Sequence, residues 1–148
     1  MPLPQRIPNS RVELVSFERM CSIARRWGLD VRVVELLARA QSELPFDLWL
    51  FSGARSREKQ ETVSSLAFDR STHADMDTRG CPRLATGADA QPVSPAVRMD
   101  RSSVAQMGAA FVRAGLRWGG GAAVDDVGIP VGVERWHVDL GARQTHPR

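Results

Sequence analysis

Two histidines in this 148-residue chain stand close to carboxylates, although the chain has only three histidines in all. His137 lies in the stretch 132–140, GVERWHVDL, and His73 lies in RSTHADMD. A catalytic zinc ion takes three protein ligands, commonly imidazoles and a carboxylate, and leaves a fourth position for water. Its charge lowers the pKa of that water toward about 7, and a further carboxylate must accept the proton. The residue types therefore predict a hydrolytic zinc site built on these two histidines.

Glu134 is the candidate for the proton acceptor, because it lies three residues before His137. Side chains three apart point to opposite faces of a regular strand, so a bend or helical turn is required between them. Pro130 and Gly132 lie just upstream and favour irregular backbone there.

The third ligand is open among three aspartates that follow His73: Asp75, Asp77 and Asp89. Asp89 lies in ATGADAQP, where small neighbours would let the backbone approach the site closely. Asp75 instead completes an H-x-D pair which, with His137 further on, matches the order of the iron ligands in non-haem iron oxygenases. Those enzymes need many strands between the ligands, whereas this segment carries a strong helical pattern at 102–115. Zinc is therefore the favoured interpretation.

The elements that must position these residues follow from hydrophobic periodicity and caps. Residues 1–9 read as an extended arm, and 10–45 as two helices, capped by Ser10 and Asp30 and ended by Gly28 and Pro45. Further on we expect a buried strand at 46–53, a short helix at 56–68, and a long loop at 69–95 with a short strand near 88–91. A helix at 102–115, capped by Asp100 or Ser102, precedes a glycine-rich connection at 117–132, a strand-like segment at 133–140 and a tail at 142–148. Helices come first and strands later, which predicts one α+β domain over residues 1–148.

The composition argues against a nucleic-acid-binding protein, a disulfide-rich protein and a membrane protein. The formal net charge of +3 is spread along the chain, without the basic block of a nucleic-acid arm, so no nucleic-acid partner is expected. Cys21 and Cys81 do not form a disulfide framework, and free thiols are expected. The first ten residues lack the apolar run of a secretory signal, and no run approaches the roughly 20 apolar residues of a membrane span. Neither export nor stable membrane insertion is therefore expected.

Five short motifs resemble a family of zinc peptidases in the same order along the chain. They are SGARSREKQ at 52–60, STH at 71–73, TGAD at 86–89, RWGGG at 117–121 and ERWHVDL at 134–140. The family includes D-alanyl-D-alanine carboxypeptidases, D-alanyl-D-alanine dipeptidases and phage L-alanyl-D-glutamate endopeptidases. The resemblance covers about residues 46–141, which would form the catalytic core. It implies a small central antiparallel sheet with flanking helices and a zinc site in a cleft on the sheet.

The same resemblance implies roles for individual residues. The zinc ligands would be His73, Asp89 and His137, and Glu134 would be the general base. Arg55 would stabilise the developing oxyanion. Ser71 and Trp136 would line the substrate cleft.

The chain departs from the family pattern between the first two ligands. The usual spacing would put the aspartate at position 80, which is glycine here, so residues 74–84, ADMDTRGCPRL, would form an inserted loop. Closing a loop that is a few residues longer costs little free energy. A shifted alignment would make Asp75 or Asp77 the ligand instead of Asp89.

The resulting expectation is a zinc peptidase that cleaves peptidoglycan stem peptides. It would be cytoplasmic until a holin-type partner releases it to the wall, or it would be associated with a virion. The rival interpretations are a degenerate module that keeps the fold for wall binding or virion structure and, less favoured, the iron oxygenase.

Overall fold

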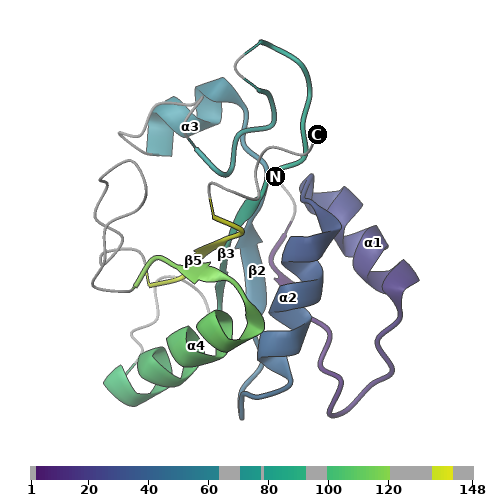
Figure 1. The fold of residues 1–148 in the computed structure, drawn as a ribbon, viewed down its shortest axis with the longest axis vertical. Helices are drawn as coiled ribbons and strands as arrows, with labels where there is room; N and C mark the ends of the chain where they lie inside the picture. The colour runs from purple at the N-terminus through teal and green to yellow at the C-terminus, as the bar shows by residue number, and fades with distance from the viewer. Residues whose placement is uncertain (1–2, 64–70, 78, 93–99, 121–134, 142–148) are drawn as a thin grey trace.

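The computed structural model describes residues 3–63, 71–77, 79–92, 100–120 and 135–141. These residues form an α+β fold with one five-stranded antiparallel sheet in the order β1-β2-β3-β5-β4 (Figure 1). The strands are β1 (Gln5–Arg6), β2 (Trp49–Ser52), β3 (Gly87–Gln91), β4 (Arg117–Trp118) and β5 (His137–Asp139). The helices are α1 (Phe17–Trp27), α2 (Val31–Gln41), α3 (Arg57–Val63) and α4 (Arg101–Ala114). The predicted fold class is confirmed.

The first helix begins later than its apolar spacing predicts. α1 starts at Phe17, with Ser16 as the N-cap that accepts a hydrogen bond from the backbone of Arg19, so the prediction of a cap at Ser10 is wrong. Residues 10–13 form a turn in which the side chain and carbonyl of Asn9 accept three backbone N–H groups. An Asn side chain that bonds the following backbone competes with helix formation.

The starts of α2 and α4 match their predicted caps, whereas α2 ends at Gln41, before the predicted stop at Pro45. Asp30 accepts the backbone N–H of Arg32 at the start of α2, and Asp100 accepts that of Ser103 at the start of α4. At the end of α4, Gly115 adopts the left-handed conformation with a φ of 104°. Glycine reaches that conformation without steric cost, which is why it commonly ends helices.

Two segments that were not predicted as strands form strands at the edges of the sheet. The N-terminal arm is extended as predicted, and as β1 it pairs antiparallel with β2. The prediction of a glycine-rich connection from residue 117 is wrong at its start, where β4 pairs with β5. Trp118 of β4 packs against Gly108 of α4, where an added Cβ would lie 2.3 Å from the indole ring. The bare helix surface at Gly108 therefore gives this short strand a packing partner.

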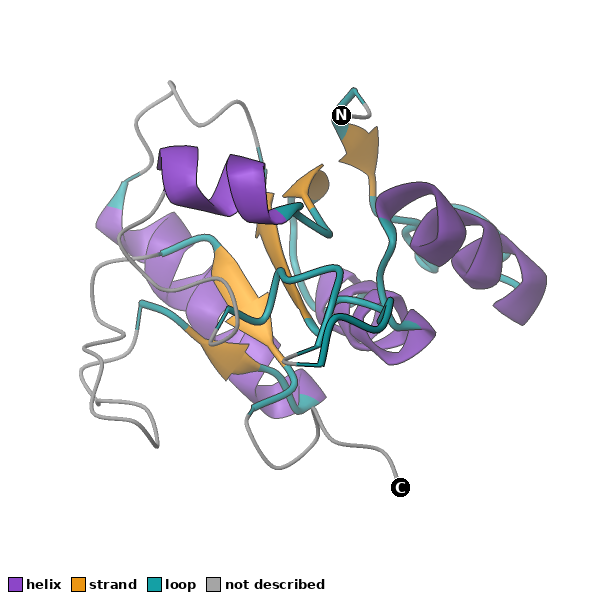
Figure 2. Cartoon of the chain, turned by 90° about the horizontal axis from the view of Figure 1, so that it is seen from above, coloured by secondary structure: helices purple, strands orange, loops and turns teal. Residues whose placement is uncertain are grey.

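One face of the sheet packs into the hydrophobic core, and the side chains of the opposite face lie outside that core. α2 packs between α1 and α4, and both views place α1 and α4 on opposite sides of the molecule (Figures 1 and 2). Sheet residues that belong to the buried core are Leu50, Ala88, Ala90 and Val138. Because side chains alternate along a strand, the neighbours of Ala88 and Val138 must point to the opposite face. Among the described residues, no helix combines the length and apolar character needed to span a bilayer.

Candidate metal centre

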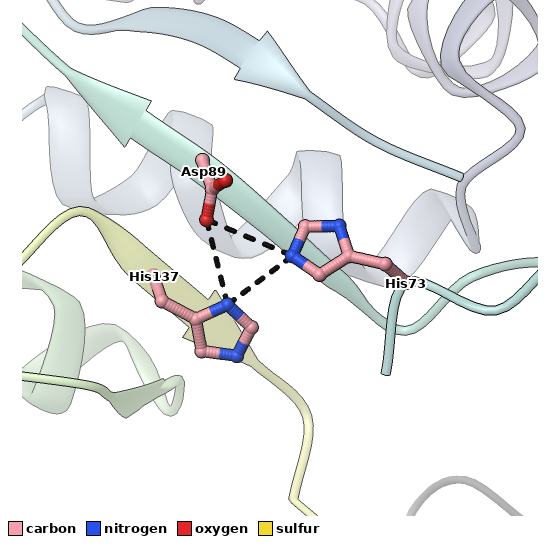
Figure 3. A group of neighbouring side chains, drawn as sticks. All are labelled: His73, Asp89 and His137. Carbon is pink, nitrogen blue, oxygen red and sulfur yellow. Dashed lines mark hydrogen bonds and ion pairs between the residues drawn. The ribbon is translucent and has the colours of Figure 1, made fainter. Parts of the chain in front are cut away.

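The side chains of His73, Asp89 and His137 meet on the face of the sheet opposite the core (Figure 3). One carboxylate oxygen of Asp89, Oδ1, lies 3.6 Å from Nε2 of His73 and 3.5 Å from Nδ1 of His137. The two imidazole nitrogens lie 3.3 Å apart. One ligand atom from each residue falls within 4.8 Å of the others, the spacing of a group that could hold a metal ion.

The strand register explains why two of these side chains meet. Asp89 of β3 lies directly opposite His137 of β5 in the antiparallel pair, so both side chains leave the sheet on the same face. Ala88 and Val138 are opposite each other one position away and point into the core. The alternation of small apolar and polar residues in both strands therefore puts the carboxylate and the imidazole together.

His73 comes from the loop 71–77 and is held there by its backbone. Its amide N–H donates to Oγ of Ser71 at 3.1 Å, and its carbonyl accepts the amide N–H of Arg55 at 2.6 Å. The carbonyl of the preceding residue, Thr72, accepts two amide N–H groups from the start of β3. The loop is thus fixed to both the segment after β2 and the strand that carries Asp89.

Hydrogen bonds on the far side of each imidazole decide which nitrogen faces the centre. Nδ1 of His73 lies 2.7 Å from the carbonyl oxygen of Gly53, which only accepts, so this nitrogen carries the proton. Nε2 of His137 lies 2.8 Å from a carboxylate oxygen of Asp139, which sets the other tautomer. In the neutral rings, Nε2 of His73 and Nδ1 of His137 therefore present lone pairs to each other and to Asp89. When both rings are neutral, these three acceptor atoms converge with no donor from the described residues between them, an arrangement that fits a bound cation in place of a proton.

Asp139 and Arg117 support His137 and were missed in the sequence analysis. Asp139 is fully buried, and both of its oxygens accept hydrogen bonds from the guanidinium of Arg117, at 2.7 and 2.8 Å. The two residues are opposite each other in the β4–β5 pair. The available signal was the spacing H-x-D, since residues two apart in a strand share a face. The role of Arg117 depended on recognising β4.

Charge in the centre is balanced between these groups. Burial lowers the pKa of His137, but hydrogen bonds to Asp139 and Asp89 and their negative charges outweigh burial and raise that pKa to about 9. Burial raises the pKa of Asp139, but its contacts with His137 and Arg117 hold it at about 2. The pKa of Asp89 is far below its usual range because contacts with both histidines outweigh burial. The centre therefore keeps its carboxylates ionised and attracts positive charge.

Arg55 lies beside the centre and contacts one of the candidate ligands. Its guanidinium donates to Oδ2 of Asp89 at 3.1 Å, to Oγ of Ser52 at 3.2 Å and to Oε1 of Gln60 at 3.2 Å. Its Nε is buried and has no hydrogen-bond partner among the described residues. Arg55 thus fixes the carboxylate oxygen that does not face the histidines.

Ser71 and Trp136 are both adjacent to the candidate ligands. Ser71 is only 4% exposed, and its hydroxyl contacts the backbone of His73 and Oε1 of Gln60. Trp136 is partly buried in the turn before β5, and its carbonyl accepts the amide N–H of Ala90. The guanidinium of Arg135 lies 5.4 Å from the indole ring. Residues 135 and 136 thus form a turn before His137. Glu134 lies outside the described residues, so its position relative to His137 stays a prediction.

The loop between the first two ligands returns close to its starting point. Met76 pairs with Pro82, the amide N–H of Asp77 donates to the carbonyl of Cys81, and Arg83 donates to the carbonyls of Ser71 and Ala74. The inserted residues can therefore protrude without displacing His73 or the start of β3.

The two alternative aspartates do not join the centre. The side chain of Asp77 accepts the amide N–H groups of Arg79 and Cys81 within the inserted loop. Neither Asp75 nor Asp77 belongs to the group of ligand atoms around the histidines in the described part of the chain. The H-x-D arrangement needed for an iron oxygenase is therefore not formed, and a five-stranded sheet flanked by helices is not the fold of that class.

Comparisons with known proteins find no match to the sequence, but they find a solved structure with a similar fold. No family model and no curated protein matches the sequence. Among solved structures, the chain is similar to the L-Ala D-Glu endopeptidase ChiX of Serratia marcescens, with 19% sequence identity and a TM-score of 0.56. The similarity covers 91% of this chain and 96% of the ChiX chain. The chain therefore has the fold of an L-Ala D-Glu endopeptidase.

Proposed function

We propose that this protein is a zinc-dependent peptidase that hydrolyses amide bonds in peptidoglycan stem peptides. The observation that carries the proposal is the convergence of His73, Asp89 and His137, with both imidazole tautomers set by acceptors behind the rings. The similarity to an L-Ala D-Glu endopeptidase over nearly the whole chain supports the reaction class. Among the bonds that the motif resemblance allows, it favours the L-Ala–D-Glu bond over the D-Ala–D-Ala bond.

The donor set fits zinc better than the harder divalent ions. His73 and His137 would supply two nitrogen ligands and Asp89 one oxygen ligand, a set that suits zinc, whereas calcium and magnesium prefer oxygen ligands. When bound, zinc supplies a Lewis acid that polarises the scissile carbonyl and makes water acidic enough to react near neutral pH.

The protein's own residues would perform the other tasks of hydrolysis. Glu134 is proposed as the base that takes the proton from the attacking water and returns it to the leaving amine. Arg55 holds Asp89 in place, and its fixed positive charge would favour the negative charge that develops on the carbonyl oxygen. Ser71 orients His73 through its backbone, and Trp136 is proposed to contact the substrate beside His137.

We also propose where the enzyme acts in the cell. The enzyme would wait in the cytoplasm for a holin-type partner to give it access to the wall, or it would be carried on a virion. Its partner in either case is the peptide portion of peptidoglycan. No nucleic-acid partner is proposed.

The direct test is digestion of purified peptidoglycan with and without a chelator, followed by mass spectrometry of the released fragments. We expect fragments with new L-Ala carboxyl termini and D-Glu amino termini, no release with chelator, and recovery on adding zinc. The His137→Ala variant should lose both zinc and activity. Full activity after exhaustive chelation would refute the proposal, as would stoichiometric zinc in His137→Ala.

A further inference from the structure

A basic surface hollow adjoins the candidate metal centre. Its volume is about 640 Å3, and it lies between the end of α1 and the segment that links β2 to α3. Four of its lining residues are basic, namely Arg25, Arg26, Arg55 and Lys59, and none is acidic. The other lining residues are Trp27, Gly28, Gly53, Ala54 and Ser56. We call this site the basic hollow.

Among the described residues, no carboxylate pairs with three of the four positive charges in the basic hollow. Arg25, Arg26 and Lys59 are exposed, and none of them forms an ion pair with a described acidic residue. Like charges held close together repel one another, and an anion bound between them relieves that repulsion. Arg55 differs, since its guanidinium already pairs with Asp89. The basic hollow thus carries positive charge that its lining residues do not neutralise.

Two lining residues connect the basic hollow to the candidate metal centre. The carbonyl of Gly53 accepts the hydrogen bond that fixes the tautomer of His73, and Arg55 contacts Asp89. Arg55 therefore borders both sites, whereas Gly53 lies behind the imidazole of His73, on the side of the ring away from the centre.

Backbone contacts hold together the two segments that line the basic hollow, namely the end of α1 and the segment after β2. The amide N–H of Ala54 donates to the carbonyl of Trp27 at 2.8 Å. At Gly53 an added Cβ would lie 2.5 Å from that carbonyl oxygen, so only glycine allows the two segments to approach so closely. The end of α1, which carries Arg25 and Arg26, is therefore fixed relative to His73.

We propose that the basic hollow is a subsite for a free carboxylate of an acidic peptide substrate. This inference rests on the proposed function and names the feature of the substrate that would be recognised. A glutamate joined to the chain through its amino group and one carboxyl retains its other carboxylate, so a substrate cut at an L-Ala–D-Glu bond is anionic beside the scissile amide. The planar guanidinium groups of Arg25 and Arg26 match the geometry of a carboxylate.

The test compares two peptides that differ in a single group. Both contain the L-Ala–D-Glu bond and end in an amide, but one keeps the free glutamate carboxylate and the other carries an amide there. For the zinc-loaded wild type we expect kcat/KM to be about tenfold higher on the acidic peptide, the size expected for two ion pairs at an open site. In the double variant Arg25→Gln/Arg26→Gln this preference should disappear, through a rise in KM for the acidic peptide alone.

The matched control is Arg19→Gln/Arg39→Gln, which removes the same net charge from exposed positions of α1 and α2 outside the basic hollow. It should keep the preference for the acidic peptide. Equal losses on both peptides in Arg25→Gln/Arg26→Gln, or the same loss of preference in the control, would overturn the subsite.

A binding measurement separates this inference from the proposed function. Calorimetric titration of the chelated protein with each peptide should show tighter binding of the acidic form in the wild type and no difference in Arg25→Gln/Arg26→Gln. If neither peptide is cleaved but this binding difference is present, the proposed function fails and the carboxylate subsite stands. If both peptides are cleaved equally and bind equally, the function stands and the subsite is refuted.

Discussion

Asp139 lies two residues after His137 on β5 and accepts a hydrogen bond from its Nε2 at 2.8 Å, on the side of the ring away from Asp89. The carboxylate is fully buried, and Arg117 of the neighbouring strand binds both of its oxygens. This pairing orients the imidazole so that Nδ1 faces Asp89 and His73. Partners of this kind behind a metal-binding histidine commonly contribute about 10–100-fold in metal affinity.

We expect Asp139→Asn to lower zinc affinity by about 10–100-fold, because the amide is a weaker acceptor and no longer balances the charge of Arg117. Competition with a chromophoric chelator measures the affinity, and thermal unfolding of the chelated protein measures the fold. Asp77→Asn, a change of the same kind in the inserted loop, serves as the control. Unchanged zinc affinity in Asp139→Asn alongside a lower melting temperature would show that Asp139 is only structural.

The third ligand is tested by comparing the three aspartates that follow His73. Because only Asp89 lies within reach of both histidines, Asp89→Asn should abolish stoichiometric zinc binding, while Asp75→Asn and Asp77→Asn should retain it. Metal content after dialysis, measured by inductively coupled plasma mass spectrometry, decides between them. Loss of zinc in Asp75→Asn or Asp77→Asn with retention in Asp89→Asn would reverse the assignment.

The sequence predicts the helices of this fold well because their signals are local. The caps at Asp30 and Asp100 and the apolar spacing behind them each lie within a few residues. The start of α1 was predicted too early because the turn formed by Asn9 breaks the helical pattern at residues 10–13. β4 has only two residues, and it depends on pairing with β5 and on contact with Gly108, neither of which leaves a local signal.

In the candidate metal centre, too, features with a local sequence motif were predicted, and features that depend on contacts between distant segments were not. The three candidate ligands were predicted because their motifs occur in family order, and the register of Asp89 against His137 brings them together. Gly53 contributes only a backbone carbonyl, which no residue type reveals in advance. Arg117 could be connected with His137 only through the pairing of β4 with β5. Contacts made by backbone atoms and by short edge strands are therefore what the sequence analysis missed.

The role of Glu134 is tested by Glu134→Gln, which keeps the size of the side chain and removes its ability to accept a proton. We expect bound zinc to remain at one equivalent while kcat falls by about 10²–10⁴-fold, the usual contribution of a general base. Single-turnover hydrolysis of the peptide with a free glutamate carboxylate, alongside metal analysis, provides the measurement. Activity close to wild type with zinc bound would remove Glu134 from this role.

Gly87 provides a test of how tightly the loop that carries His73 is held against β3. An added Cβ at Gly87 would lie 2.1 Å from Oγ1 of Thr72 and 3.2 Å from Cε1 of His137, so Gly87→Ala must displace the loop or the ring. Overpacking of this kind costs about 1–3 kcal/mol of stability, and we expect zinc affinity to fall with it because two ligands move apart.

Two comparisons separate this effect from general destabilisation. Leu37→Ala removes a fully buried side chain from α2, which carries none of the site residues, and should lower the melting temperature without changing zinc affinity. Thr72→Gly combined with Gly87→Ala removes the side chain that the new methyl group would meet, so it should restore part of the affinity. If Leu37→Ala weakens zinc binding as much as Gly87→Ala does, the loss reflects overall stability and not the position of His73. The close packing at Gly87 would then have no special role in the centre.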